Sequence, residues 1–284
     1  MEGVLLINKP KGPSSFHVVK KVRALSGAKK VGHAGTLDPE ASGLLILCLG
    51  RYTKLASMLM NGHKIYRAVF RLGETTASDD QESPVLERLS IDHLSRSDVE
   101  QALKSFLGKI EQIPPKYSAI KVAGRRAYDL ARSEQDVLLS PRAVEIFDLV
   151  IEKWDLPEIT VRIHCTKGTY VRALARDLGQ KLGVGAHASA IVRMASGQFS
   201  IDKAIGLSDL SKDALLANLL QGAKAVKGIN IIELTEADKN NAIHGREILE
   251  QFKLPSEEAL AFYDGVPIVI VKRGVWGVKI MRVL

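Results

Sequence analysis

The chain has 284 residues, a hydrophobic content of 46%, a charged content of 25% and a formal net charge of +8. A chain of this length and composition can bury a sizeable core and can form one large domain or a domain with a small module. It has no apolar run long enough for a transmembrane helix, so we expect no contact with a membrane. The positive charge suits a polyanionic partner but does not establish one.

Two cysteines, Cys48 and Cys165, lie far apart in apolar, strand-like runs. The absence of a C-x-x-C motif or a Cys/His cluster argues against a zinc site and against a disulfide framework. We interpret both as small core residues. The chain enters a strand pattern at Val4 without the pattern of a signal peptide. These features predict a reducing, cytoplasmic setting.

The first predicted elements are a strand at residues 4–7 and a basic helix that Ser14 or Ser15 can cap. An apolar stripe on this helix is approximated by Phe16, Val19, Val22 and Leu25. The basic residues of the helix lie largely off the stripe. They form either a solvated face or a face that contacts phosphates. Lys9 and Lys11 in the preceding loop would add to a phosphate-contacting face.

A glycine-punctuated loop at residues 32–43 precedes an apolar strand pattern at residues 44–49. The loop carries Asp38, and the following Pro39 restricts the backbone of both residues. Asp38 can be a turn residue that bonds its own backbone, a neighbour of a phosphate-binding loop or a catalytic carboxylate. No G-x-x-x-x-G-K-[ST] pattern is present, and local features alone favour the turn.

The middle of the chain alternates helix and strand patterns. A helix is predicted from Thr53 to Met60, and a strand from Lys64 to Leu72 places Tyr66 on its apolar face. An acidic segment at residues 73–96 leads to a predicted capping box at Ser97–Glu100.

The second half begins with a predicted basic helix at Arg125–Arg132. Paired strands are predicted at Ala143–Ile151 and Ile159–Cys165, and the helix after them has Tyr170 and Arg172 at its start. The elements predicted next are a strand at Ala190–Ala195 and an amphipathic helix at Leu207–Leu220.

Residues 221–228 have the composition of a linker, and the chain beyond it is rich in short strand patterns. We therefore divide the chain into a domain at residues 1–222 and a small β-rich module at residues 229–284. Strands mixed with helices without regular βαβ spacing indicate an α+β fold.

The loop sequence G-H-A-G-T-L-D-P-E-A-S-G-L-L at residues 32–45 resembles the catalytic motif of bacterial TruB-type tRNA pseudouridine-55 synthases. Further segments resemble motifs of that family in the family's order: Asn8–Ser15, Lys64–Arg67, Pro114–Lys121 and Lys167–Arg172. The resemblance covers most of residues 3–200. Ser42 stands where the family usually has threonine, and it keeps the hydroxyl group.

This resemblance implies the pseudouridine-synthase fold, with a mixed, mainly antiparallel sheet around a central RNA-binding cleft. It also implies a small PUA-like RNA-binding module at the C-terminus, on the weaker match of Leu234–Glu236 and His244–Gly245.

The implied activity is an isomerase that flips a uridine out of the T-loop of tRNA and converts it to pseudouridine. No atoms are gained in this reaction, so no metal or organic cofactor is expected. The implied partner is the T-stem-loop of tRNA, and we expect a monomer without a protein partner.

The resemblance also implies roles around the reacting base. Asp38 would be the catalytic carboxylate, acting as nucleophile or as base at the ribose, and Arg172 would hold it ionised and oriented. Tyr66 would stack on the flipped uracil, with its phenol placed for proton transfer near C5. Tyr170 would line the pocket, and Ile191 would supply an apolar wall.

Other residues would contact the RNA around the target. His33 would fill the gap that the flipped base leaves. Asp80 would contact the RNA or the base, although the neighbouring Asp79 makes the alignment ambiguous. Lys9 and Lys11 would contact phosphates, and a solvated loop is an equal alternative for each.

Two alternatives share the same cleft. A tRNA-binding or tRNA-folding protein without chemistry needs the base-flipping surface, but it need not retain Asp38, Tyr66 and Arg172 together. A guide-RNA-dependent relative that modifies ribosomal RNA is disfavoured, because the chain lacks a basic low-complexity tail and its C-terminal module is small.

Overall fold

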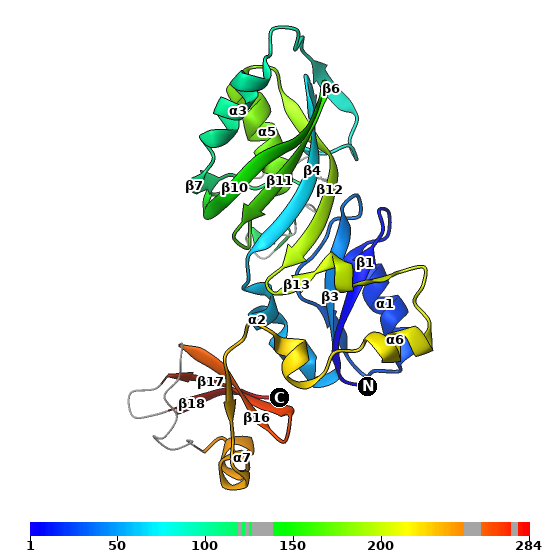
Figure 1. Ribbon diagram of the computed structural model, residues 1–284, viewed down its shortest axis with the longest axis vertical. Helices are drawn as coiled ribbons and strands as arrows, with labels where there is room; N and C mark the ends of the chain where they lie inside the picture. Colours follow the sequence, from blue (N-terminus) through cyan, green and yellow to red (C-terminus); the bar gives the residue numbers. More distant parts are fainter. Residues whose placement is uncertain (119–120, 123–124, 127–138, 247–256, 274–277) are drawn as a thin grey trace.

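The structure is a computed structural model that describes residues 1–118, 121–122, 125–126, 139–246, 257–273 and 278–284. An elongated α+β body forms most of it, and a small β module lies at one end (Figure 1). No helix among the described residues is long and apolar enough to cross a membrane.

The body is built on a ten-stranded mixed sheet of the order β14-β1-β3-β12-β4-β11-β10-β7, with β2 beside β3 and β13 beside β12. Its strands are β1 (Gly3–Lys9), β2 (Val31–His33), β3 (Ser42–Leu49), β4 (Lys64–Leu72), β7 (Gly108–Gln112), β10 (Arg142–Asp155), β11 (Glu158–Cys165), β12 (Ala186–Ser196), β13 (Phe199–Ser200) and β14 (Ile205–Gly206). The β1–β14 and β3–β12 pairs are parallel, and the other pairs are antiparallel. The predicted α+β fold with a mainly antiparallel sheet is therefore confirmed.

The two halves of this sheet meet where β3 pairs with β12, at Ser42–Val192 and Gly43–Arg193. Gly43 has a φ of +101°, and a Cβ atom at this position would lie 2.4 Å from the carbonyl oxygen of Arg193. Only glycine permits so close an approach of the two strands. The junction therefore brings the loop before β3 against β12 and β4.

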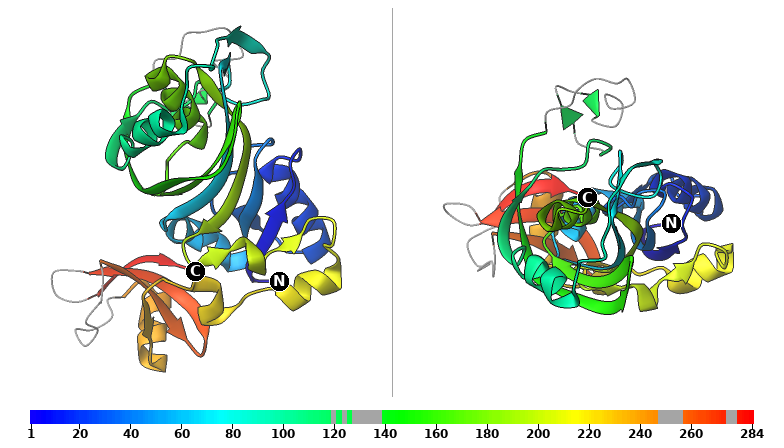
Figure 2. Two further views of the ribbon diagram at one scale, coloured as in Figure 1. Left: turned by 45° about the horizontal axis from the view of Figure 1, so that its top comes forward. Right: turned by 90° about the horizontal axis from the view of Figure 1, so that it is seen from above.

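Helices cover one face of each half of the sheet. The sheet curves around α3 (Arg96–Lys104) and α5 (Val171–Leu182), which share a hydrophobic core with β4, β10 and β11 (Figure 2). On the other half, α1 (Ser15–Ser26) shares a core with β1 and β3, and α6 (Lys212–Asn218) adds to it.

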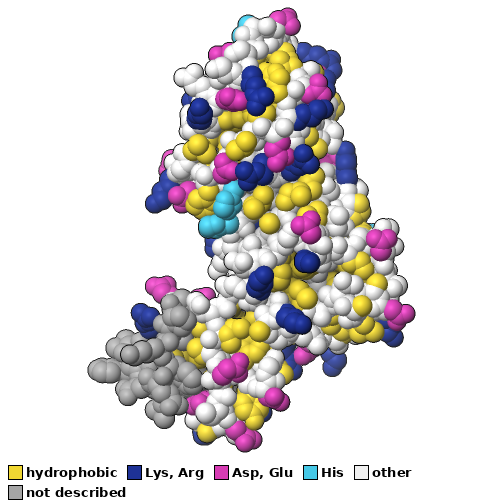
Figure 3. Space-filling model, in the orientation of Figure 1, with side chains coloured by type: hydrophobic (Ala, Val, Ile, Leu, Met, Phe, Trp, Pro, Cys, Tyr) yellow, Lys and Arg dark blue, Asp and Glu magenta, His cyan; other side chains and the backbone are white. Residues whose placement is uncertain are grey.

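The outer face of β4, β10 and β11 carries paired charges. Arg67 lies 2.7 Å from Glu152, and Arg162 lies 2.7 Å from Asp148. Acidic and basic side chains alternate on the upper part of this face (Figure 3). It therefore does not form a basic groove.

The C-terminal module is a four-stranded sheet of β15 (Ile231–Glu233), β16 (Glu258–Tyr263), β17 (Val266–Arg273) and β18 (Val278–Val283), with α7 (Glu236–Ile243) beside it. The sequence pattern missed β16 and α7. The predicted linker contains a short 3₁₀ helix (Gly222–Val226) whose Ala225 and Val226 are fully buried. Both residues belong to a hydrophobic core that also includes Phe262 of the module and strands of the body. The connection is therefore part of the packed structure.

The remaining short elements are a 3₁₀ helix (Gly50–Leu55), α2 (Ala56–Met60), β5 (Glu74–Thr76), β6 (Val85–Arg88), β8 (Lys121–Val122), β9 (Arg125–Arg126) and a 3₁₀ turn (Ile201–Lys203).

Several local predictions were wrong. The buried face of α1 excludes Phe16, which is 62% exposed. Ser95, rather than Ser97, caps α3 in a capping box with Asp98. The predicted helix at Leu207–Leu220 is shortened to α6. The predicted helix at Arg125–Arg132 begins with β9, and its remainder lies outside the described residues.

Candidate active site

The loop that carries Asp38 is held from the side of α1. Ser15 is buried at the start of this helix, and its hydroxyl donates to the carbonyl of Leu37 at 2.8 Å and accepts the N–H of Leu37 at 2.9 Å. On the other side of Asp38, the carbonyl of Pro39 accepts the N–H of Gly12 at 2.8 Å. The backbone on both sides of the carboxylate is thus fixed.

Arg193 holds the same loop from β12. Its guanidinium donates to the carbonyls of Leu44 at 2.8 Å, Gly35 at 3.0 Å and Thr36 at 3.2 Å. The side chain is only 2% exposed. A buried cation shared by three carbonyls satisfies their hydrogen bonding and fixes the turn before Asp38.

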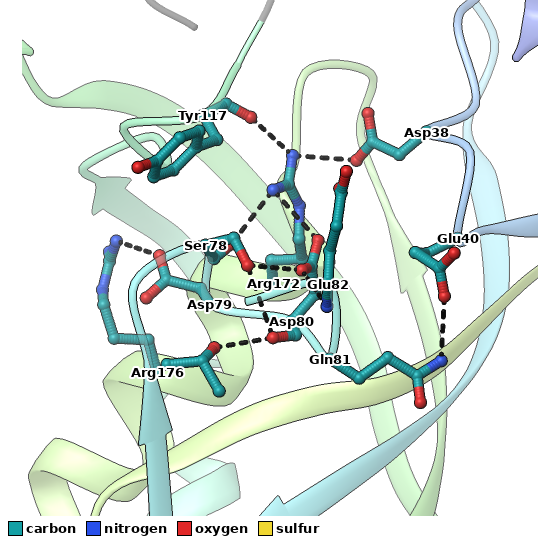
Figure 4. Close-up of polar contacts among 11 residues, drawn as sticks. Asp38, Glu40, Ser78, Asp79, Asp80, Gln81, Glu82, Tyr117, Arg172 and Arg176 are labelled. Carbon is teal, nitrogen blue, oxygen red and sulfur yellow. Dashed lines mark hydrogen bonds and ion pairs between the residues drawn. The ribbon is translucent and has the colours of Figure 1, made fainter. Parts of the chain in front are cut away.

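Arg172, at the start of α5, links Asp38 to a second carboxylate (Figure 4). Its Nη2 lies 2.8 Å from Asp38 Oδ2, and its Nη1 lies 3.2 Å from Asp80 Oδ2. Nη1 also donates to the carbonyl of Ser78 at 3.0 Å, and Nη2 to that of Tyr117 at 2.9 Å. The Arg172 side chain is 5% exposed, whereas that of Asp38 is 44% exposed. Arg172 is therefore held by Asp80 and two backbone carbonyls on its buried side, whereas Asp38 remains open to the cavity.

The structure brings Asp80, and not Asp79, to this arginine. Asp80 is buried and also accepts the Ser78 hydroxyl at 2.5 Å. Asp79 has a positive φ of 59° and pairs with Arg176 at 3.0 Å. Burial raises the pKa of the Asp79 carboxyl, and the nearby guanidinium of Arg176 opposes this change.

A cavity of about 270 Å³ opens beside Asp38. Tyr66 on β4, Ile191 on β12 and Tyr170 before α5 line it together with Asp38 and Arg172. Burial raises the pKa of both phenols, so both stay neutral near pH 7. A pocket with two aromatic rings, one apolar wall and one carboxylate can enclose a planar base and present a charged group to its sugar.

The backbone of Tyr170 is fixed by a side chain from the edge of the sheet. Gln112, which is 1% exposed, accepts the N–H of Tyr170 at 2.8 Å and donates to its carbonyl at 3.1 Å. The sequence analysis missed both Gln112 and the loop-holding role of Arg193. A charged residue inside a strand pattern was the available signal for Arg193.

Lys9 does not lie at a surface where it could contact a phosphate, so that prediction was wrong. Its side chain is completely buried, and its ammonium donates to the carbonyls of Pro10, Pro13 and Pro39 at 2.9–3.2 Å. Burial lowers the pKa of Lys9 to about 8, and the nearby charge of Asp38 opposes this shift.

Lys11 and His33 lie outside the lining of the cavity. The side chain of Lys11 is 54% exposed and pairs with Glu40 at 2.8 Å. The Nδ1 atom of His33 is buried without a hydrogen-bond partner, and burial lowers the pKa of its imidazole.

A second buried lysine borders the cavity. Lys64 donates to the carbonyls of Met60 at 3.0 Å and Gly62 at 2.7 Å, and burial lowers its pKa to about 8. The described residues contain no group of three or more His, Cys, Asp or Glu side chains placed to hold a metal ion.

Solved structures of known proteins share this fold. A chain from the crystal structure of a Cbf5–Nop10–Gar1 complex superposes with a TM-score of 0.76 at 22% identity, covering 99% of this chain and 84% of that one. A chain from an archaeal box H/ACA sRNP Nop10–Cbf5 complex gives a TM-score of 0.74 at 21% identity, covering 99% and 85%. These similarities show a shared fold.

Closer relatives define the family. Residues 23–171 match the model of the N-terminal domain of TruB family pseudouridylate synthases, and residues 172–261 match that of the tRNA pseudouridylate synthase B C-terminal domain. The tRNA pseudouridine synthase B of Clostridium tetani is 40% identical over 83% of this chain and 82% of its own length. That of Dehalococcoides mccartyi strain CBDB1 is also 40% identical, over 93% and 89%. The chain belongs to the TruB family of pseudouridylate synthases.

Proposed function

We propose that this protein converts a uridine in the T-loop of tRNA to pseudouridine, with Asp38 as the catalytic carboxylate. The observation that carries the proposal is the 2.8 Å ion pair between Asp38 and the buried Arg172 at the side of a cavity lined by Tyr66 and Tyr170. The named relatives support tRNA as the substrate.

The reaction breaks the N1–C1′ bond of the flipped uridine and forms a C5–C1′ bond after the uracil rotates. N1 gains a proton and C5 loses one, so the nucleotide keeps its composition. Asp38 acts at the ribose, as nucleophile or as base. Arg172 orients that carboxylate through the ion pair, and its contacts with Asp80 and the carbonyls of Ser78 and Tyr117 limit its own movement.

The two tyrosines and Ile191 enclose the uracil. Because its phenol is neutral, Tyr66 offers an uncharged ring for stacking and recovers part of the cost of unstacking the base. Its hydroxyl is our candidate for proton transfer near C5. Tyr170 lines the pocket beside it.

Residues beside the cavity contact the surrounding RNA. His33 enters the gap that the flipped base leaves in the RNA. When RNA binds, Lys11 breaks its ion pair with Glu40 and pairs with a phosphate instead. Asp80 acts mainly through Arg172, because the Asp80 carboxylate is buried and pairs with that arginine.

We further infer a cytoplasmic monomer that needs no protein partner and no cofactor, since one chain supplies Asp38, Arg172 and Tyr66. The free, buried Cys48 and Cys165 support a reducing compartment. We keep residues 1–222 as the catalytic domain and residues 229–284 as a PUA-like RNA-binding module, and the two share a hydrophobic core.

The test uses a T-stem-loop transcript with tritium at C5 of uracil, because pseudouridine formation releases that hydrogen to water. We expect release by the purified protein without added metal or cofactor, and a loss of at least about 1,000-fold for Asp38→Asn, which cannot act as nucleophile or base.

Binding of the same transcript by Asp38→Asn serves as the control for folding. Tight binding by both proteins without tritium release from either would contradict the proposal and indicate a tRNA-binding protein without chemistry.

A further inference from the structure

One buried polar atom of a residue that lines the cavity makes no hydrogen bond of acceptable geometry. Three buried side-chain polar atoms of the described chain make no hydrogen bond, and they belong to His33, Ser118 and Ser196. Buried polar groups in folded proteins nearly always have partners, so an exception calls for an explanation. Ser118 lines the cavity beside Asp38, whereas Ser196 lies outside its lining.

The segment before Ser118 is held firmly. Pro114 and Pro115 are buried and stiffen the chain, and the carbonyl of Tyr117 accepts a hydrogen bond from Arg172 at 2.9 Å. The Ser118 side chain is 4% exposed. The residue that orients Asp38 thereby also holds the backbone next to Ser118.

Ser118 also lies close to the phenol of Tyr170. Its hydroxyl opposes the rise in the pKa of Tyr170 that burial causes, although no hydrogen bond of acceptable geometry joins the two groups. The hydroxyl therefore lies next to a ring proposed to line the uridine pocket, and its contact with that ring falls short of a hydrogen bond of good geometry.

We propose that Ser118 binds the substrate: its hydroxyl hydrogen-bonds to a polar edge of the flipped nucleotide. This inference rests on the proposed function, because it places that nucleotide in the cavity. A serine hydroxyl both donates and accepts, so the uracil edge and the ribose 2′-hydroxyl share the required chemistry. The cost of removing the hydroxyl from water is met during folding, and the hydrogen bond is recovered when the nucleotide enters.

The first test compares tritium release by the wild type, Ser118→Ala, Ser118→Thr and Ser196→Ala. We expect kcat/KM of Ser118→Ala to fall by about three- to tenfold, as for the loss of one neutral hydrogen bond. Ser118→Thr keeps the hydroxyl and should retain most of the activity. Ser196→Ala removes an equally buried and unpaired hydroxyl outside the cavity, and it should behave as the wild type. Equal kcat/KM values for the wild type and Ser118→Ala would overturn the inference, and so would an equal loss in both alanine variants.

The second test measures binding of two T-stem-loop RNAs, with uridine or 2′-deoxyuridine at the target position, to Asp38→Asn with and without Ser118→Ala. A loss of affinity confined to the uridine RNA assigns the contact to the 2′-hydroxyl, and an equal loss on both RNAs assigns it to the uracil. Unchanged affinity for both RNAs would refute the contact. Failure of the proposed function is distinguishable, because wild-type protein would then release no tritium.

Discussion

Buried cations hold the chain on the two sides of the cavity beside Asp38 in different ways. On the side of the Asp38 loop, Lys9 and Arg193 each donate to three backbone carbonyls. On the side of α5, Arg172 joins two carboxylates as well as two carbonyls. The first arrangement fixes the shape of a loop, and the second also positions the carboxylate at the proposed reacting centre.

The difference has an energetic consequence. A carbonyl that loses its donor remains neutral and can turn to another partner or to water. A buried carboxylate that loses its cation keeps an uncompensated charge until it takes up a proton. Changes at Arg172 should therefore affect stability more than changes at the carbonyl-binding cations.

The largest effect is expected for Arg172→Met. Asp80, whose side chain is 5% exposed, would lose its ion-pair partner, and the free energy of unfolding should fall by about 3–5 kcal/mol. Tritium release should fall by at least about 100-fold, because Asp38 loses its orienting group. Urea unfolding and the tritium assay measure the two losses separately.

The control for this change is Arg176→Met, on the same helix. Arg176 pairs with Asp79 and its side chain is 29% exposed, so water replaces part of the lost interaction and the destabilisation should be smaller. Adding Asp80→Asn to Arg172→Met should restore part of the stability without restoring activity. Equal destabilisation by the two arginine changes would contradict the argument that losing a fully buried ion pair costs more than losing a partly exposed one.

The sequence predicted the fold class and the residues that the cavity brings together, because these follow from strand periodicity and from motifs spread along the chain. Asp38, Tyr66, Tyr170, Arg172 and Ile191 all line one cavity. What the sequence lacked was the direction of individual side chains.

Neighbouring residues of the same type illustrate this limit. Ser14 caps α1 by accepting the N–H of His17, whereas the next residue, Ser15, turns inward and holds Leu37. Asp79, which has a positive φ in this turn, and Asp80 likewise face different arginines. Successive helical residues differ in direction by about 100°, and a turn residue in the left-handed region redirects the chain. Either change decides which partner a side chain contacts, and the residue type alone does not reveal it.

Lys9 was misjudged for a related reason. A lysine in a proline- and glycine-rich loop is usually exposed. Here three carbonyls converge on its ammonium, two of them within its own loop and one from Pro39, about thirty residues later in the chain. Such convergence depends on tertiary structure and has no local pattern.

A loss of catalysis with little loss of binding is expected for Arg193→Met. Three carbonyls before and after Asp38 would lose their donor and the loop would loosen. Because small displacements of a reacting group are costly, kcat should fall by about 10- to 100-fold. Affinity for the T-stem-loop, measured in the Asp38→Asn background, should change by less than about threefold. Arg193→Lys keeps the charge but has a different donor geometry, so its kcat should lie between those of the wild type and Arg193→Met. A parallel fall of kcat and affinity would contradict a role confined to positioning Asp38.

The smallest effect concerns pH and comes from the buried Lys9. Its pKa is about 8 in the folded protein and near 10.5 when exposed, so between these values the unfolded chain binds more protons than the folded one. Since the free energy of unfolding rises with pH wherever the unfolded state binds more protons, Lys9 should add about 1 kcal/mol between pH 7 and pH 9. Lys9→Met removes the titrating group, so it should lack this rise with pH. Urea unfolding of both proteins at pH 7, 8 and 9 measures the difference, with the remaining titrating groups common to both. If the two stability curves stay parallel over this range, the ammonium of Lys9 keeps an ordinary pKa, and its three carbonyl contacts offset burial completely.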